Sequence, residues 1–167
     1  MENTELSKTI QDVVKMTINE YEKNRREEEK KRVLHNTKLL LKHYNSLKAH
    51  AMKSVYKIED IEKDIEEIDG DDKAYILSIR RSKLRTLIMV SHIDAALKEL
   101  KDKKLREGTY EQYRALTMFY IDCKTYEEIQ GELNCGKNSP LRWINSAVRD
   151  LSILLFGVDG LKISNLG

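Results

Sequence analysis

The sequence contains few residues that interrupt regular structure. Its 167 residues include one proline and seven glycines, which is too few for a disordered linker protein. Hydrophobic residues make up 40% of the chain and charged residues 35%. This composition is sufficient for a modest apolar core, and the length corresponds to one or two small domains.

Signals for membrane insertion and secretion are also lacking. No apolar run approaches the roughly 18 residues that a membrane-spanning helix requires. The opening Met-Glu-Asn-Thr-Glu lacks the basic start and apolar centre of a signal peptide. Cys123 and Cys135 stand alone in the sequence, and isolated thiols suit a reducing cytoplasm. We therefore expect a cytoplasmic protein with no membrane partner.

Motifs for catalysis and for metal binding are absent from the sequence. The two cysteines form no CxxC pair of the kind found in zinc sites. The four histidines are His35, His43, His50 and His92. His43 and His50 lie seven residues apart, unlike the i, i+4 spacing of helical zinc sites. No glycine-rich phosphate loop or nucleophile motif occurs, so we expect no catalytic residue, no metal ligand, no cofactor and no enzymatic activity.

Residues 1–32 are predicted to form an N-terminal amphipathic helix followed by a charged bridge. Apolar residues recur at helical spacing at Leu6, Ile10, Val13, Val14, Ile18 and Tyr21. Residues 22–32 contain no apolar residue at all. Mixed charges at helical spacing allow a fully solvated helix in this stretch, and a mobile bridge is the alternative.

Residues 33–107 are predicted to form a long antiparallel helical hairpin. Two series with seven-residue spacing indicate a coiled-coil type of seam. They are Thr37, Tyr44, Ala51, Ile58 and Ile65, and Leu40, Leu47, Ser54, Ile61 and Ile68. A second apolar pattern follows at Ile76, Leu77, Leu84, Leu87, Ile88, Ile93, Ala96, Leu97 and Leu100. Asp69-Gly70-Asp71-Asp72 separates the two helices and supplies a helix start, so the second helix should fold back on the first.

Charge is distributed unevenly over this hairpin, although the net charge of the chain is only +2. Residues 59–72 hold nine acids and one lysine, and Lys73, Arg80, Arg81, Lys83 and Arg85 follow the turn, which favours antiparallel pairing. Residues 30–57 hold eight Lys or Arg and no acid. Lys98, Lys101, Lys103, Lys104 and Arg106 lie at the same end of the hairpin. We expect that end to expose a positive surface available to nucleic acid, with an ordinary solvated lysine-rich face as the alternative.

Residues 108–157 are predicted to form a three-helix domain that ends in a helix-turn-helix. Gly108-Thr109 precedes a helix at 110–121 whose inward residues are Tyr113, Leu116 and Tyr120. Thr125 and Glu128 have the spacing of a capping box that starts the next helix. Ile129 and Leu133 give that helix its apolar face. Residues 158–167 are expected to form a flexible tail.

The turn and the last helix are specified by a short run of residues. Gly136 is expected to take a left-handed turn conformation after Asn134-Cys135. Ser139 and Pro140 are expected to open the last helix as N-cap and first helical residue. That helix should run to about Phe156 and carry Ile144, Ala147, Val148, Leu151 and Leu155 at core spacing.

The helix at 139–156 has the charge expected of a helix that reads DNA. Residues 137–149 include three basic residues and no acid, and phosphates attract Lys and Arg but repel acids. The candidate DNA-binding residues are Lys137, Asn138, Ser139, Arg142, Asn145, Ser146 and Arg149. Arg142 is the candidate for a base contact, because arginine pairs bidentately with guanine. Lys137 and Arg149 are the candidates for phosphate contacts, and a helical bundle with incidental charge placement is the alternative.

The C-terminal segment resembles region 4 of bacterial sigma factors. The likeness is carried by Leu116 and Tyr120 in a leading helix, by Thr125-Tyr126-Glu127-Glu128-Ile129 and Leu133, and by Ile144, Ala147 and Leu151. Together with residues 34–44 and 85–94, the chain resembles the ArpU/RinA-type regulators. These are small sigma-like transcription regulators encoded in prophages of Gram-positive bacteria and often associated with late-gene control. The resemblance implies a nucleoid-associated bacterial protein that also contacts RNA polymerase.

We therefore expect an all-α, sequence-specific transcription regulator that binds double-stranded DNA. A homodimer through the helical hairpin is compatible with the weak heptad seam. Two other functions remain open. A small-terminase-like DNA-packaging subunit of a phage would form a ring, and a helical protein-interaction adaptor would not bind DNA.

Overall fold

The computed structural model describes residues 2–65 and 71–157, and the side chains of residues 13–53 and 77–157. Its helices are α1 (Glu2–Ile65), α2 (Asp71–Arg106), α3 (Tyr110–Tyr120), α4 (Tyr126–Leu133) and α5 (Ser139–Phe156). The described residues contain no β-strand, so the predicted all-α fold is confirmed.

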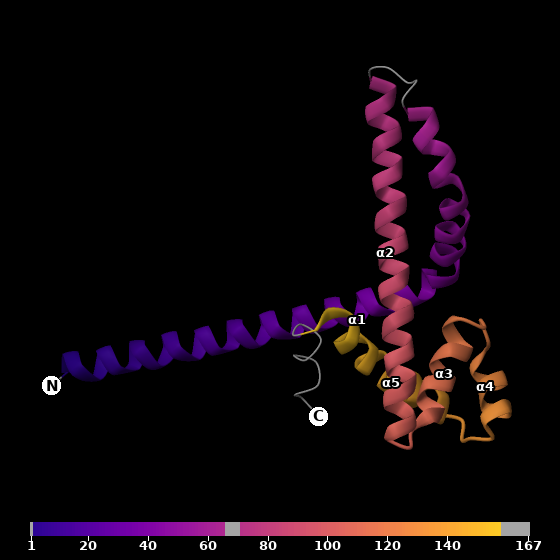
Figure 1. Ribbon diagram of the computed structural model, residues 1–167. Coiled ribbons are helices and arrows are strands. Elements are labelled where there is room, and N and C mark those ends of the chain that lie inside the picture. The colour runs from indigo at the N-terminus through magenta and orange to yellow at the C-terminus, as the bar shows by residue number, and fades with distance from the viewer. Residues whose placement is uncertain (1, 66–70, 158–167) are drawn as a thin grey trace.

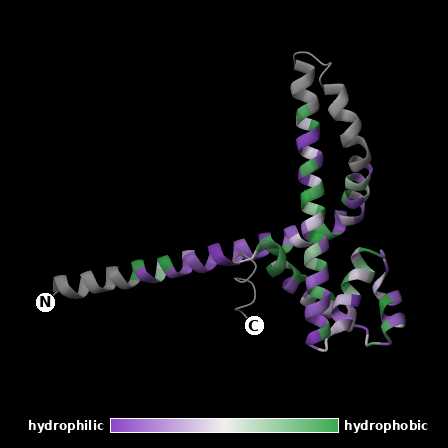
Figure 2. Ribbon diagram, viewed as in Figure 1, coloured by the Kyte–Doolittle hydropathy of each residue, from purple (hydrophilic) through white to green (hydrophobic). Residues whose placement is uncertain are grey.

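Helix α1 is continuous through the segment for which a solvated helix and a mobile bridge were the alternatives. Its N-terminal half projects from the rest of the molecule (Figure 1). Every described side chain from residue 13 to residue 28 is exposed, and hydrophilic residues cover much of this half (Figure 2). Four apolar side chains, Val13, Met16, Ile18 and Tyr21, are nevertheless more than half exposed. No other part of the described chain covers them.

The C-terminal part of α1 and the N-terminal part of α2 form an antiparallel pair, and α2 then continues past the crossing to pack against α3 and α5 (Figure 1). Helix α1 changes direction near its crossing with α2, where the Tyr44 hydroxyl donates a hydrogen bond to Asp94. The Lys48 ammonium lies 3.2 Å from the same carboxylate. These contacts fix α1 on α2 at the point where the two helices begin to run side by side.

The heptad seam is confirmed where its side chains are described. Thr37, Tyr44 and Ala51 are buried, and Leu40 and Leu47 are half-buried. The remaining seam positions of the first helix, the acidic run at 59–72 and the Asp69–Asp72 turn lie outside the described side chains. On α2 the predicted core residues Ile93, Ala96, Leu97 and Leu100 are buried. Leu84 and Ile88, which belong to the same apolar pattern, are exposed.

One apolar core joins the helical pair to the three C-terminal helices. Its buried members come from all five helices: Leu41 and Tyr44; Ile93, Ala96, Leu97 and Leu100; Ala115, Leu116 and Met118; Ile129; and Ile144, Ala147, Val148 and Leu151. Helix α5 packs against α1, α2, α3 and α4. The boundary predicted at 107/108 falls in the α2–α3 connection, but the core continues across it.

Because the core is shared, Leu100→Ala should destabilise the hairpin and the C-terminal helices together. Leu100 is fully buried, and removing such a side chain costs about 2–5 kcal/mol. The only tryptophan, Trp143, lies in α5. Urea unfolding followed by Trp143 fluorescence and by far-ultraviolet circular dichroism should therefore give coincident transitions that shift equally.

Leu105→Ala is the control, because Leu105 is exposed and such a substitution changes stability by about 0.5 kcal/mol or less. A Leu100→Ala shift in only one of the two signals would contradict a shared core.

Candidate nucleic-acid interface

Helix α4 begins at the predicted capping box. The Glu128 backbone N–H donates to the Thr125 hydroxyl at 3.3 Å, and the Thr125 backbone N–H donates to the Glu128 carboxylate at 2.7 Å. The backbone N–H and hydroxyl of Thr125 lower the pKa of Glu128, because both donate to its charged form. Ile129 is fully buried one turn further on, so the cap and the apolar face together set the direction of α4.

The turn between α4 and α5 differs from the prediction at one residue. Asn134, not Gly136, adopts the left-handed conformation, with φ 47° and ψ 55°. Its backbone N–H reaches the carbonyls of Gln130 and Gly131. Asparagine tolerates this conformation better than most residues, so the helix ends two residues earlier than a glycine at 136 would allow.

The start of α5 also corrects the prediction. Asn138 occupies the N-cap position, with φ −92° and no side-chain capping bond, and Ser139 is the first helical residue. The Ser139 backbone N–H instead donates to the Gly136 carbonyl at 2.9 Å. Pro140 is buried in the first turn, where its lack of an N–H costs nothing. The tight turn before α5 thus takes the place of a side-chain cap.

Helix α5 has one buried face and one exposed face. Ile144, Ala147, Val148 and Leu151 are buried at spacings of three and four residues. Asn138, Arg142 and Arg149 are exposed and are separated by four and seven residues, which places them on one face. We call the residues Asn138, Arg142, Ser146 and Arg149 the α5 ridge.

The structure brings most of the predicted DNA-binding residues to the α5 ridge or its N-terminal end. Lys137, Asn138, Arg142 and Arg149 are exposed, and Ser139 and Ser146 are half-buried. Asn145 differs, because its side-chain oxygen lies 3.5 Å from the Lys38 ammonium of α1. Lys38 was not among the predicted DNA-binding residues. In the sequence it is distinguished only by lying in the acid-free stretch at 30–57.

Trp143 is half-buried at the edge of the core. It does not belong to the exposed face of α5.

Two lysines of α2 are paired with α5 and do not form a free positive surface. Lys103 lies 2.8 Å from the Asp150 carboxylate, and Lys104 pairs with the same carboxylate. The Lys104 side chain is only 4% exposed. At the end of α2, Arg106 lies 3.1 Å from Glu99. The predicted positive surface is therefore smaller at this end of α2, because Asp150, 47 residues away in the sequence, pairs with Lys103, whereas Lys98 and Lys101 are exposed.

Asp150 is charged in this setting. Burial favours the neutral carboxyl, but the hydrogen bonds and charges of Lys103 and Lys104 outweigh it and lower the pKa of Asp150. The only acid in α5 is thereby neutralised by α2. The α5 ridge consequently presents basic and neutral side chains alone.

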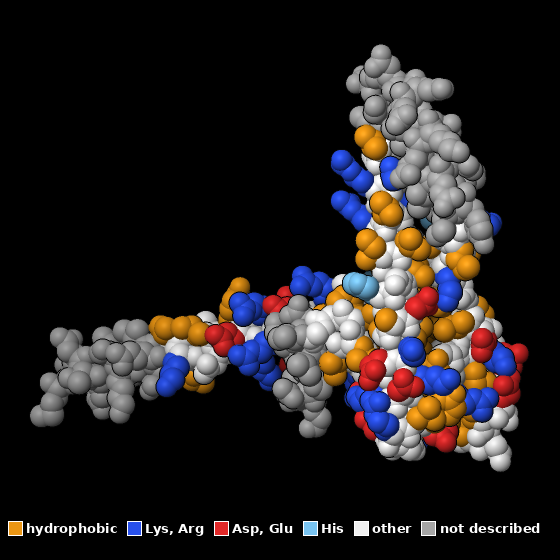
Figure 3. All heavy atoms as spheres, viewed as in Figure 1, with side chains coloured by type: hydrophobic (Ala, Val, Ile, Leu, Met, Phe, Trp, Pro, Cys, Tyr) orange, Lys and Arg blue, Asp and Glu red, His pale blue; other side chains and the backbone are white. Residues whose placement is uncertain are grey.

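Other basic residues are exposed on α1 and α2. Arg81 and Arg85 are exposed on α2, and Figure 3 shows Lys and Arg side chains along the described part of this arm. The α1 residues Lys31, Lys38 and Lys42 are exposed as well. Exposed basic side chains therefore lie on α1, α2 and α5. Of these three helices, only α5 is part of the helix-turn-helix.

The described side chains contain no group of three or more His, Cys, Asp or Glu placed to hold a metal ion. Cys123 is exposed, Cys135 is half-buried, and both are free thiols. Within residues 2–65 and 71–157, no helix combines the length and the apolar character needed to cross a lipid bilayer. No protein-family model, curated protein or solved structure matches the chain.

Asp150→Asn should destabilise the protein by about 3 kcal/mol at neutral pH, because it removes the shared carboxylate of Lys103 and Lys104 and leaves the buried Lys104 ammonium with only Glu107, 3.5 Å away. The pKa of Asp150 is lowered by folding, so its contribution is present above the ordinary carboxyl pKa and is lost as pH falls below about 4. Urea unfolding at a series of pH values should show the largest difference between wild type and variant near neutrality, and a shrinking difference in acid.

Asp122→Asn is the matched control, because Asp122 is exposed. A constant difference between wild type and Asp150→Asn across this pH range would show that the Asp150 charge does not stabilise the fold.

Proposed function

We propose that the chain is a sequence-specific transcription regulator that reads double-stranded DNA with α5. The observation that carries this proposal is the α5 ridge, an acid-free face presented by a helix-turn-helix. A recognition helix lies in the major groove with its N-terminal residues near the bases. Lys137, Asn138 and Arg142 occupy the corresponding part of α5 and the turn before it.

The supporting geometry assigns different roles along the α5 ridge. Arg142 is exposed on the second turn of the helix, and its planar guanidinium suits the two acceptors of guanine. Arg149 lies two turns further on, where a side chain meets the sugar-phosphate backbone. Phosphate contacts position a protein on DNA without specifying sequence.

The resemblance to sigma region 4 and to ArpU/RinA-type regulators extends the proposal. It supports a prophage-encoded regulator of late genes, associated with the nucleoid, that also contacts RNA polymerase. Co-sedimentation with purified RNA polymerase tests this part separately from DNA binding. The polymerase contact is excluded if the chain sediments alone.

Arg142→Ala should relax sequence preference. A binding site is first selected from a pool of random duplexes with the wild-type chain, and affinity is then measured by fluorescence anisotropy at fixed salt. Loss of a bidentate guanine contact should cost about 1–3 kcal/mol on the selected duplex and little on a scrambled duplex. Arg81→Ala is the control, since Arg81 is exposed far from α5. If the scrambled and selected duplexes weaken equally, Arg142 does not read a base.

Arg149→Ala should weaken both duplexes by a similar factor. Loss of one phosphate contact should also reduce the slope of log affinity against log salt by about one. Titrations at several salt concentrations measure both quantities. An unchanged slope would place Arg149 away from the DNA backbone.

The same experiments distinguish the two alternatives. A chain that selects no sequence and forms a ring in analytical ultracentrifugation would be better described as a packaging subunit. A chain that binds no DNA even at low salt would be an adaptor for other proteins.

A further inference from the structure

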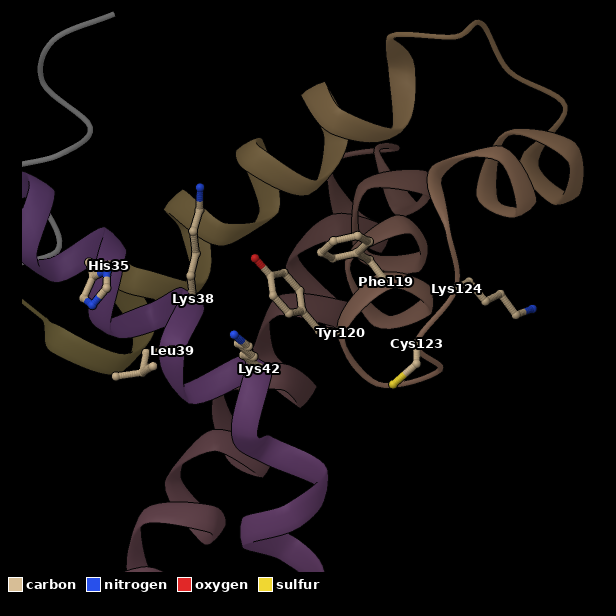
Figure 4. Close-up of a pocket in the computed structure, with 8 residues that line it drawn as sticks. All are labelled: His35, Lys38, Leu39, Lys42, Phe119, Tyr120, Cys123 and Lys124. Atoms are coloured by element: carbon tan, nitrogen blue, oxygen red, sulfur yellow. The ribbon is translucent and has the colours of Figure 1, made fainter.

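A groove between α1 and α3 is lined by both apolar and cationic side chains (Figure 4). It has a volume of about 580 Å³. Its lining residues are His35, Lys38, Leu39 and Lys42 of α1, Phe119 and Tyr120 of α3, and Cys123 and Lys124 of the loop that follows. The four α1 residues have the spacing i, i+3, i+4 and i+7, so they lie on one face of that helix.

The apolar part of the groove is held rigidly but is not covered. Phe119 stacks on Tyr126 with ring centroids 5.0 Å apart and meets Tyr120 edge-on at 4.9 Å. Asn45 of α1 donates to the Ile121 carbonyl at 2.7 Å, which fixes the end of α3 against α1. Leu39, the apolar lining residue of α1, is 45% exposed. Apolar surface set in a preformed cleft of this size is typical of binding sites.

The cationic part of the groove has unsatisfied positive charge. Lys42 is exposed, and the Lys38 ammonium donates to the neutral Asn145 side chain at 3.5 Å; neither lysine has an ion-pair partner among the described residues. Lys124 is different, because it pairs with Glu132 and points away from the groove (Figure 4). None of the lining residues is an acid.

We propose that this groove binds an acidic peptide segment of a partner protein. The segment places large apolar side chains against Leu39 and against the rings of Phe119 and Tyr120, and Asp or Glu beside Lys38 and Lys42. The phosphates of a DNA backbone would pair with the lysines of this groove, but phosphates and sugars would not bury its apolar side chains. A peptide that combines an apolar anchor with acids satisfies both halves. The inference does not depend on DNA binding by α5.

The test is a selection from a phage-displayed library of random short peptides on the full-length chain. Enriched peptides should share a large apolar residue flanked by Asp or Glu. A synthetic peptide of that sequence should bind the Leu39→Ser and Lys42→Glu variants with affinity reduced by about tenfold or more. Both positions are exposed, so the variants should fold, and far-ultraviolet circular dichroism verifies this.

Met52→Ser and Lys53→Glu are matched controls, because both residues are exposed on α1 and neither lines the groove. They should bind the peptide as the wild type does. The proposal is overturned if no peptide is enriched, or if the enriched peptides lack acids. It is also overturned if the groove variants bind the synthetic peptide as tightly as the control variants do. If no peptide is enriched and Lys42→Glu weakens binding to a random DNA duplex, the groove belongs to the nucleic-acid surface instead.

Discussion

The packing of α5 against the other helices is the constraint on which the rest of the structure depends. Ile144, Ala147, Val148 and Leu151 occupy one face of the helix and are buried. Burying each such side chain contributes about 1.5–3 kcal/mol for the larger residues, so rotation of α5 about its axis would be very costly. The direction of Arg142 and Arg149 is therefore set by the core and not by the exposed residues themselves.

The positive charges of the molecule fall into two physically different groups. Lys103 and Lys104 both form ion pairs with Asp150, and these ion pairs join α2 to α5. Other lysines and arginines, among them Lys42, Arg142 and Arg149, are exposed and can interact with other molecules. Because a buried ammonium must be paired whereas an exposed one need not be, net charge along the sequence overstates the positive surface at the end of α2.

The local interactions and the antiparallel pairing of α1 with α2 were predictable from the sequence, whereas individual contacts between helices were not. The capping box at Thr125 and Glu128 joins residues three apart, so its spacing alone identifies it. The left-handed residue was misplaced because both Asn134 and Gly136 can adopt that conformation. The pairing of Lys104 with Asp150 and the groove beside Leu39 depend on how α1, α2 and α3 meet, which residue spacing within one helix does not determine. DNA reading by α5 stays a prediction.

The uninterrupted course of α1 makes its projecting half a rigid spacer. A helix advances about 1.5 Å and turns about 100° per residue, so the apolar positions at 13–21 stand about 18 to 30 Å from Val33, the first buried residue of the described chain. Anything attached there would be held at a fixed distance and a fixed rotational angle from the core. Inserting a single residue before Val33 would swing that attachment to another side of the molecule while hardly changing its distance.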